Sequence, residues 1–129
     1  MPRALLTLSV LPDKYAICRL DPSGAPPLWA MQGAFWSVIR TAEEMSVVCL
    51  ETAVPAALQH EAGWRILKCE GPLDFELTGI MASIAAPLAD AGVSIFPLAT
   101  YDTDYVLVKD AALEAASRAL TDYGHVVHV

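Results

Sequence analysis

Residues 73–108 constrain the fold of this chain more strongly than any other stretch, because the period of their apolar positions changes along it. Spacings of three and four over 79–91 predict an amphipathic helix, and Gly92 can adopt the left-handed conformation that ends a helix. The segment 93–98 alternates apolar with small or polar residues, and 105–108 is rich in β-branched and aromatic side chains, which predicts two strands. With an apolar strand upstream and a polar loop between the later two, the predicted order is strand, helix, strand, loop, strand.

The predicted helix has marked ends and one irregular position. Thr78 can cap its first turn through the side-chain oxygen. Pro87 lies inside it, where a proline removes one backbone donor and clashes with the carbonyl of Ser83. We therefore expect a kink or a local irregularity near Pro87.

Three motifs of this region resemble those of ACT domains. They occur in order: Thr78-Gly79-Ile80 at the helix start, Asp90-Ala91-Gly92-Val93-Ser94-Ile95 at the helix exit, and Thr100-Tyr101-Asp102-Thr103-Asp104-Tyr105-Val106-Leu107-Val108. More narrowly, they are similar to motifs of small bacterial tandem ACT proteins and of the ACT halves of CASTOR-type arginine sensors. The resemblance implies an α+β, ferredoxin-like fold with helices on one face of an antiparallel sheet. One departure is that Thr78 stands where such domains usually have proline.

The N-terminal half predicts strands and one irregular loop. Alternating segments over 4–11 and 15–20, joined by a proline-aspartate turn, predict a hairpin. Three prolines and a glycine exclude helix and central strand from 21–27. Further strands are expected over 34–40 and 46–50, so the chain should hold roughly eight strands in all.

A weak internal repeat relates the first half of the chain to the second. In each half a loop and a strand precede a helix, a glycine and a further strand, and the helices are expected near 55–62 and 111–123. The two halves share the order of their predicted elements but few identical residues, so a chance similarity is the alternative. Taking the repeat as real, we expect a tandem of two ACT-like units, a divergent one over 1–63 and an ACT domain over 64–129.

Composition narrows the class of protein and of partner. Of the 129 residues 55% are hydrophobic, so part of this apolar surface should be buried between protomers or half-domains, and we expect a homodimer or larger assembly. A formal charge of −7 would repel a phosphate backbone. No stretch reaches the roughly 18 apolar residues that span a bilayer, and no signal peptide is recognisable. We therefore expect a cytoplasmic protein that binds neither nucleic acid nor membrane.

The cysteines and histidines do not predict a metal site. Cys18, Cys49 and Cys69 lie in predicted strands at wide spacings, which fits buried free thiols better than disulfides or a Cys-x-x-Cys site. His125 and His128 are three residues apart on a predicted strand and point to opposite faces, which argues against joint ligation. No metal or other cofactor is expected.

Two aspartates of the polar loop are candidate site residues. Asp102 and Asp104 could form a carboxylate pair for acid–base work or metal binding, but only Asp74 and Asp90 are nearby as a third ligand. Asp102 could equally bond its own backbone in a turn. Asp104 lies where an apolar strand begins, and a carboxylate there requires a cation or several donors, such as a ligand ammonium or guanidinium.

Backbone groups complete the predicted site. Gly79 leaves the first amides of the helix open to a small anion, although it could merely open the helix. Ser94 and Ile95 lead into the next strand, where backbone groups could hold the carboxylate or amine of an amino acid. By resemblance to the arginine sensors, this strand start and Asp104 face the effector. The helix start at Gly79, the strand entry at Ser94 and Ile95, and Asp104 are expected to line one pocket. The predicted ligand-binding residues are Thr78, Gly79, Ile80, Ser94, Ile95, Thr100, Asp102 and Asp104.

No arrangement of side chains in the sequence indicates catalysis. The sequence has no serine-histidine-aspartate order, cysteine-histidine pair or phosphate-binding loop. We therefore expect a non-enzymatic regulatory or sensor protein that binds a small ligand, by resemblance an amino acid, at a junction between units or protomers. The alternative is a structural protein–protein interaction module with a vestigial ligand site. The sequence identifies neither the amino acid nor the regulated protein.

Overall fold

The chain forms two compact units in the computed structural model, which describes residues 5–71, 73 and 78–129. The helical unit comprises residues 1–12 and 65–129, and the strand unit comprises residues 13–64. Strand β5, His60–Cys69, contributes its first residues to the strand unit and its last residues to the helical unit. Within the described ranges, no helix is both long and apolar enough to cross a bilayer.

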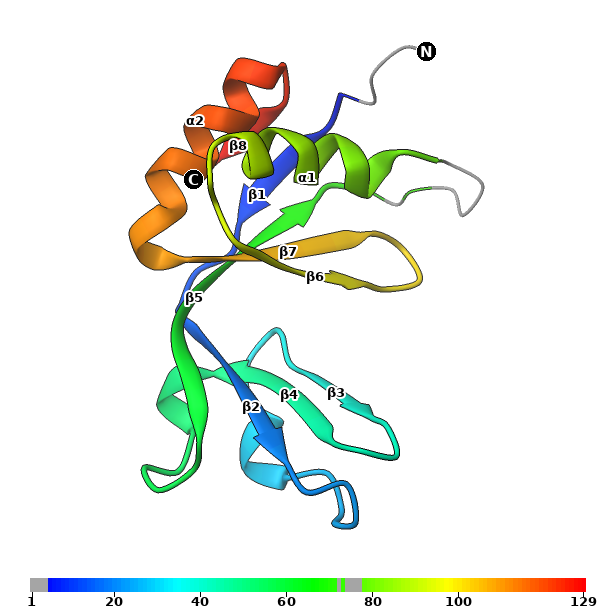
Figure 1. Cartoon of the computed structure of the whole chain (residues 1–129), viewed down its shortest axis with the longest axis vertical. Coiled ribbons are helices and arrows are strands. Elements are labelled where there is room, and N and C mark those ends of the chain that lie inside the picture. Colours follow the sequence, from blue (N-terminus) through cyan, green and yellow to red (C-terminus); the bar gives the residue numbers. More distant parts are fainter. Residues whose placement is uncertain (1–4, 72, 74–77) are drawn as a thin grey trace. The chain divides into compact units, whose positions relative to one another are not determined.

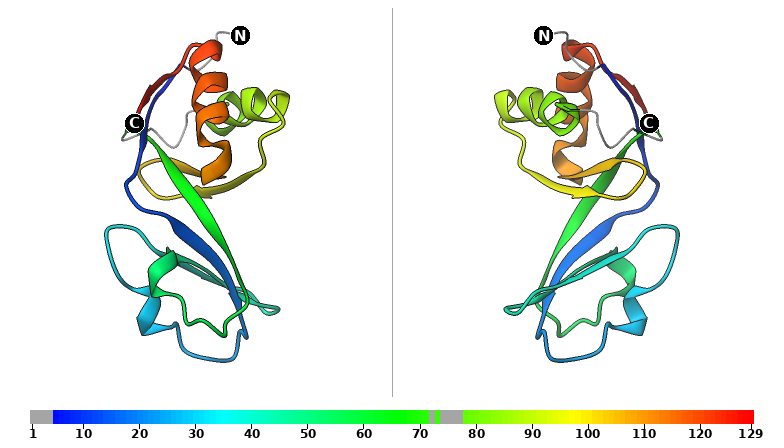
Figure 2. Two further views of the ribbon diagram at one scale, coloured as in Figure 1. Left: turned by 90° about the vertical axis from the view of Figure 1, so that its left-hand side faces the viewer. Right: turned by 90° about the vertical axis from the view of Figure 1, so that its right-hand side faces the viewer.

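The helical unit is a sheet with two α-helices on one face. Besides the end of β5, its elements are β1 (Thr7–Val10), α1 (Ile80–Asp90), β6 (Ile95–Ala99), β7 (Asp104–Lys109), α2 (Leu113–Tyr123) and β8 (Val126–His128). The strands lie in the order β8-β1-β5-β7-β6 (Figure 1). Both helices lie on the same side of β1 and β8 (Figure 2). The element order β5-α1-β6-β7-α2-β8 is ferredoxin-like, so the predicted α+β class is confirmed.

Strand β1 is inserted between β5 and β8, which the sequence did not predict. β1 pairs antiparallel with β5, with Leu8 opposite Cys69, and parallel with β8, with Leu8 opposite Val127. The predicted hairpin between 4–11 and 15–20 is therefore wrong. Both edges of β1 are occupied by strands distant in sequence, and fully buried Leu8 belongs to the core of the helical unit, so long-range pairing prevails over the local turn residues.

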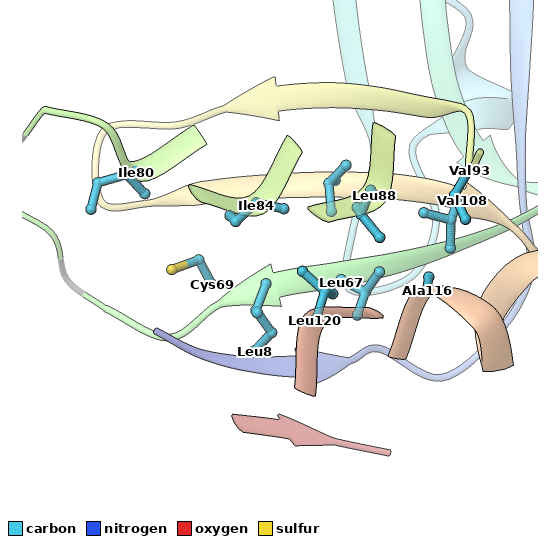
Figure 3. Close-up of a cluster of buried hydrophobic side chains, with 11 residues drawn as sticks. Leu8, Leu67, Cys69, Ile80, Ile84, Leu88, Val93, Val108, Ala116 and Leu120 are labelled. Atoms are coloured by element: carbon cyan, nitrogen blue, oxygen red, sulfur yellow. The ribbon is translucent and has the colours of Figure 1, made fainter. Parts of the chain in front are cut away.

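The core of the helical unit lies between the helices and the sheet (Figure 3). α1 contributes Ile80, Ile84 and Leu88, whose spacing of four residues is the apolar face predicted from the sequence. α2 adds Ala116 and Leu120, both fully buried. Burying a leucine or isoleucine stabilises a fold by about 1.5–3 kcal/mol, so these faces fix both helices on the sheet.

His125 joins three segments of the helical unit. Pro87 has no N–H, so the carbonyl of Ser83, four residues earlier, lacks its usual helical donor. Nε2 of His125 lies 2.8 Å from that carbonyl oxygen, and Nδ1 accepts the Leu6 N–H at 3.0 Å. Because a carbonyl only accepts, Nε2 carries the proton. The buried imidazole thus satisfies the position that Pro87 leaves unpaired, and α1 continues through Pro87 to Asp90.

The strand unit contains no α-helix within its residues 13–64. Its elements are β2 (Tyr15–Leu20), β3 (Ser37–Arg40), β4 (Met45–Leu50), the start of β5, and short 3₁₀ turns at Leu28–Ala30 and Glu51–Ala53. The strands lie in the order β3-β4-β2-β5. The predicted loop over 21–27 has neither helix nor strand, as expected from its prolines. All three cysteines of the chain are free and buried, as predicted.

The short helix predicted near 55–62 is wrong. Residues 55–59 form turns, with the Leu58 N–H donating to the Pro55 carbonyl at 3.0 Å, and β5 already begins at His60. Gly63, interpreted as a helix stop, lies inside β5 with a φ of 80°. The register between β2 and β5 shifts at this point, so Gly63 provides the left-handed residue of a β-bulge. A glycine with positive φ serves either purpose, and the sequence pattern did not distinguish them.

The division of the sequence into a divergent ACT-like unit over 1–63 and an ACT domain over 64–129 remains a prediction. Contacts within the chain assign residues 1–12 to the helical unit, where β1 completes the sheet. A fragment of residues 64–129 would therefore lack a strand that lies between two others.

Candidate functional site

The loop with the predicted aspartates is a hydrogen-bonded turn. The Thr100 N–H donates to the Thr103 carbonyl at 2.9 Å, and the Thr100 hydroxyl lies 3.1 Å from the same oxygen. The Thr103 hydroxyl donates to the Cys69 carbonyl at 2.6 Å, which ties the turn to the end of β5. Among the described contacts, Thr100 rather than Asp102 supplies the side chain that bonds this turn.

The segment after β5 packs against the same turn. The Leu73 N–H donates to the Asp102 carbonyl at 2.7 Å. A Cβ at Gly71 would lie 3.0 Å from the Leu73 nitrogen and 3.3 Å from the Asp102 carbonyl oxygen, so only glycine fits there without displacement. The turn is thus held from two sides while the Asp102 residue stays exposed.

Asp104 is the first residue of β7 and pairs with Ala99 of β6. It is half-buried and, by the alternation of the strand, lies on the same face as the core residue Val106. No ion pair of Asp104 occurs within the described part of the chain. Its carboxylate therefore lies at the margin of the core without a cation among the described residues.

The thiol of Cys69 lies in the electrostatic environment of Asp104. Burial, above all, raises the pKa of this thiol, and the charges of Asp104 and Glu70 act in the same direction. A hydrogen bond with Thr103 opposes them. Cys69 is consequently a protonated, buried neighbour of the candidate site and not a nucleophile.

The start of α1 is open. Its N-terminal flanking residue is Gly79, with φ 75° and ψ 7°, and no side chain among the described residues caps the helix. The predicted cap by Thr78 is therefore wrong, because the left-handed glycine itself occupies the capping position. The first turn has no acidic residue, and a Cβ at Gly79 would meet nothing within 4 Å. Amides and partial positive charge at this helix end can face an anion.

The predicted site residues fall into two groups. Thr78, Gly79 and Ile80 lie at the start of α1, which both Figure 1 and Figure 3 show at the same end of the unit as the turn between β6 and β7. Thr100, Asp102 and Asp104 belong to that turn or border it. Ser94 and Ile95 lie beyond the other end of α1, whose 11 residues span about 16 Å. A single copy of the unit does not bring both groups to one ligand.

Strand β6 lies at the edge of the sheet. Among the described strands it pairs only with β7, in an antiparallel register from Ile95 opposite Val108 to Ala99 opposite Asp104. Ser94 precedes it and is exposed. Apart from Pro97 at its middle, which has no N–H, the outer edge of β6 therefore offers backbone groups to a further strand, with Ser94 at one end and Thr100 at the other.

The described residues hold no group of three or more histidine, cysteine, aspartate or glutamate side chains placed to bind a metal ion. The described residues therefore provide no third metal ligand beside Asp102 and Asp104.

A family model of the ACT domain matches residues 59–122. The chain belongs to the ACT-domain family. The match runs from β5 to α2, and it includes both the start of α1 and the turn that precedes Asp104. A second model, which describes an N-terminal domain, matches residues 13–57.

Curated relatives of this ACT-domain protein match over part of their length. The human protein named cytosolic arginine sensor for mTORC1, subunit 1, is 36% identical over 58 residues, which cover 44% of this chain and 18% of the human protein. The bovine protein of the same name matches to the same extent. The chain therefore spans less than a fifth of the length of these sensors.

Solved structures resemble the ACT-domain protein over nearly its whole length. A protein of Agobacterium tumefaciens is 38% identical with a TM-score of 0.90, covering 98% of this chain and 93% of that chain. The regulatory subunit of aspartate kinase from Thermus flavus is 13% identical with a TM-score of 0.63, covering 94% of this chain and 99% of that chain. At that low identity the second likeness concerns the fold alone.

Proposed function

We propose that this ACT-domain protein is a non-enzymatic regulatory protein that binds an amino acid at the start of α1. The observation that carries the proposal is that two groups without a partner among the described residues, the start of α1 and the Asp104 carboxylate, lie at one end of the helical unit. The two groups have opposite electrostatic character. They suit a ligand that has an anionic and a cationic end.

The ligand carboxylate would accept hydrogen bonds from the first amides of α1, where Gly79 presents no side chain. Its cationic end would meet Asp104. A charge-assisted hydrogen bond contributes about 1.5–3 kcal/mol, so loss of the Asp104 carboxylate should weaken binding about ten- to hundredfold. The name of the human relative, an arginine sensor, makes L-arginine the first ligand to test.

We propose further that each site is completed by a second copy of the chain. Antiparallel pairing of two β6 edges about a two-fold axis would bring Ser94 and Ile95 of one copy near Thr100 of the other. Such a homodimer accounts for the two separate groups of predicted site residues and for the 55% hydrophobic composition. Light scattering should report a dimer at tens of micromolar, whereas a 13.8 kDa monomer would contradict this part of the proposal.

A thermal-shift screen over the standard amino acids tests the binding function. A ligand at about a hundred times its dissociation constant stabilises the native state by about 2.7 kcal/mol, which shifts the melting temperature of a chain this small by several degrees. Asp104→Ala should remove most of that shift. Asp122→Ala, an exposed aspartate on α2, is the matched control and should respond as wild type.

Two outcomes would contradict the proposal. If all amino acids at millimolar concentration leave the wild-type melt unchanged, the protein is better described as an interaction module with a vestigial site. If Asp104→Ala responds like wild type, an amino acid binds elsewhere.

A further inference from the structure

A hollow in the strand unit has the composition of a small-molecule site. Trp36, Val38 and Arg40 alternate along β3 and the residue before it, so their side chains share one face of the sheet. Pro26 and Met31, from the connection between β2 and β3, complete a hollow of about 480 Å³. Hollows of this volume accommodate small ligands.

The walls of the hollow are mainly apolar. Val38, one of the lining residues, packs against the core of the strand unit. Trp36 keeps 42% of its surface exposed, which is unusual for so large an apolar side chain. An indole and a methionine thioether both make favourable contacts with aromatic rings, so these walls suit a flat aromatic group.

One charged side chain lines the hollow. Nη2 of Arg40 donates to the Gly24 carbonyl, which orients the guanidinium. No carboxylate pairs with Arg40 in the part of the chain that the structure describes, although the chain carries a net charge of −7. The remaining N–H groups of the guanidinium match the planar geometry of a carboxylate.

We propose that this hollow binds a small aromatic carboxylate, with the ring against Trp36 and Met31 and the carboxylate on Arg40. A zwitterionic amino acid fits less well, because none of the five lining residues is acidic and could hold its ammonium group. The site shares no residue with the amino-acid site of the helical unit. The test of this site is therefore independent of the test of the proposed function.

Titration of the full chain with 3-phenylpropionate, followed by NMR of the tryptophan indole N–H signals, tests the site. The Trp36 signal should shift and saturate with a dissociation constant on the order of 1 mM. The Trp29 and Trp64 signals should move little. 3-Phenylpropanamide, which keeps the ring and loses the charge, should bind about tenfold more weakly, and propionate, which loses the ring, should show a similar loss.

A matched pair of arginine variants locates the charge contact. Arg40→Gln should weaken binding of 3-phenylpropionate about tenfold. Arg19→Gln should leave it unchanged, since Arg19 is also exposed and also donates to a backbone carbonyl, that of Glu43 at 3.0 Å. In the β2-β4-β3 register, Arg19 aligns with the residue next to Arg40 in β3. The side chains of the two arginines therefore lie on opposite faces of the sheet.

The proposal is overturned if the Trp36 signal does not saturate below about 10 mM 3-phenylpropionate, a range that a pocket of this kind should reach. It is equally overturned if Arg40→Gln binds as wild type does, or if the neutral amide binds as tightly as the acid. Excess L-arginine should leave the titration unchanged, and displacement by L-arginine would assign the aromatic acid to the amino-acid site instead.

Discussion

The two helices of the ACT domain differ in how their backbone groups are satisfied. α2 follows a 3₁₀ turn, Asp110–Ala112, and carries Glu114 in its first turn, where a negative charge complements the helix dipole. At its other end the Gly124 N–H bonds back to the carbonyls of Leu120 and Thr121. Like α1, α2 has no side-chain cap at its start, but an acidic residue lies in its first turn, and groups next to it in the sequence bond its C-terminal carbonyls.

α1 depends on groups from elsewhere. Its first turn has neither a side-chain cap among the described residues nor an acidic residue, and Pro87 interrupts its hydrogen-bond ladder. The carbonyl that Pro87 leaves unpaired is bonded by His125, which lies 42 positions away from Ser83 in the sequence. The start of α1 is therefore where we expect an external anion, because its first amides have no side-chain cap among the described residues, whereas the carbonyl that Pro87 leaves unpaired already has a partner.

The largest expected effect tests that dependence. His125→Ala should destabilise the chain by about 3 kcal/mol, because the Ser83 carbonyl and the Leu6 N–H would both stay buried without partners. In a Pro87→Ala background the new amide can bond the Ser83 carbonyl, so the same substitution should cost about 1 kcal/mol less. Urea denaturation measures both. Equal costs in the two backgrounds would refute the link between Pro87 and His125.

His128→Ala is the control for this cycle. His128 is exposed on β8, so its loss should change the free energy of unfolding by less than about 0.5 kcal/mol.

The second prediction compares the two helix starts directly. Ala82 and Ala115 are exposed third residues of α1 and α2. Ala82→Glu should weaken amino-acid binding about tenfold or more, because the new carboxylate competes for the α1 amides. Ala115→Glu should leave the affinity unchanged in the same calorimetric titration. Similar affinities in the two variants would mean that the ligand does not use the start of α1.

The third prediction concerns the left-handed glycine. Gly79→Ala should lower the free energy of unfolding by about 1 kcal/mol, because an alanine at φ 75° is strained while its Cβ has open space. Gly79→Asn should recover part of this loss, since asparagine tolerates the left-handed region. Chemical denaturation of both variants measures the difference. A loss of several kcal/mol would indicate a steric requirement that the open surroundings of Gly79 do not predict.

The smallest expected effect lies on α2. Glu114→Gln removes the acidic residue of the first turn and an exposed ion pair with Arg118 at 3.0 Å. The loss should be a few tenths of a kcal/mol and should shrink in salt, because exposed pairs contribute little. Thermal melts at low and high ionic strength measure this loss of stability. The amino-acid affinity of the same variant should be unchanged, because the ligand binds at the start of α1 and not at α2.

The local elements of the fold could be predicted, and the long-range ones could not. The spacing of Ile80, Ile84 and Leu88 defines α1 within a few residues, because an apolar helical face is a local pattern. The position of β1 depends on partners at the other end of the chain, so its alternation alone suggested a hairpin. Gly63 shows the same limit, since a bulge and a helix stop require the same φ.

The sequence indicated which residue types could form the candidate site, but not how these residues are arranged in space. Asp104 and Gly79 follow from residue type and from the family resemblance. The separation of Ser94 from them follows only from the path of α1. The role of His125 had a signal in the sequence, because a proline inside a helix always leaves a carbonyl that needs another donor. Arg40 gave no signal, since its hollow also requires Pro26 and Met31 from the irregular connection before β3, and no periodic pattern places them beside that strand.

Complementation between two variants tests the central claim, that each amino-acid site is built from two copies of the chain. Asp104→Ala and Ser94→Phe should each form dimers by light scattering and bind no amino acid. A heterodimer purified through a different tag on each chain should regain one site of the two, because one intact Asp104 then faces one intact Ser94. Calorimetry should report half the wild-type stoichiometry at wild-type affinity. A heterodimer that binds nothing would contradict the claim, because both of its sites would then lie within single, defective chains.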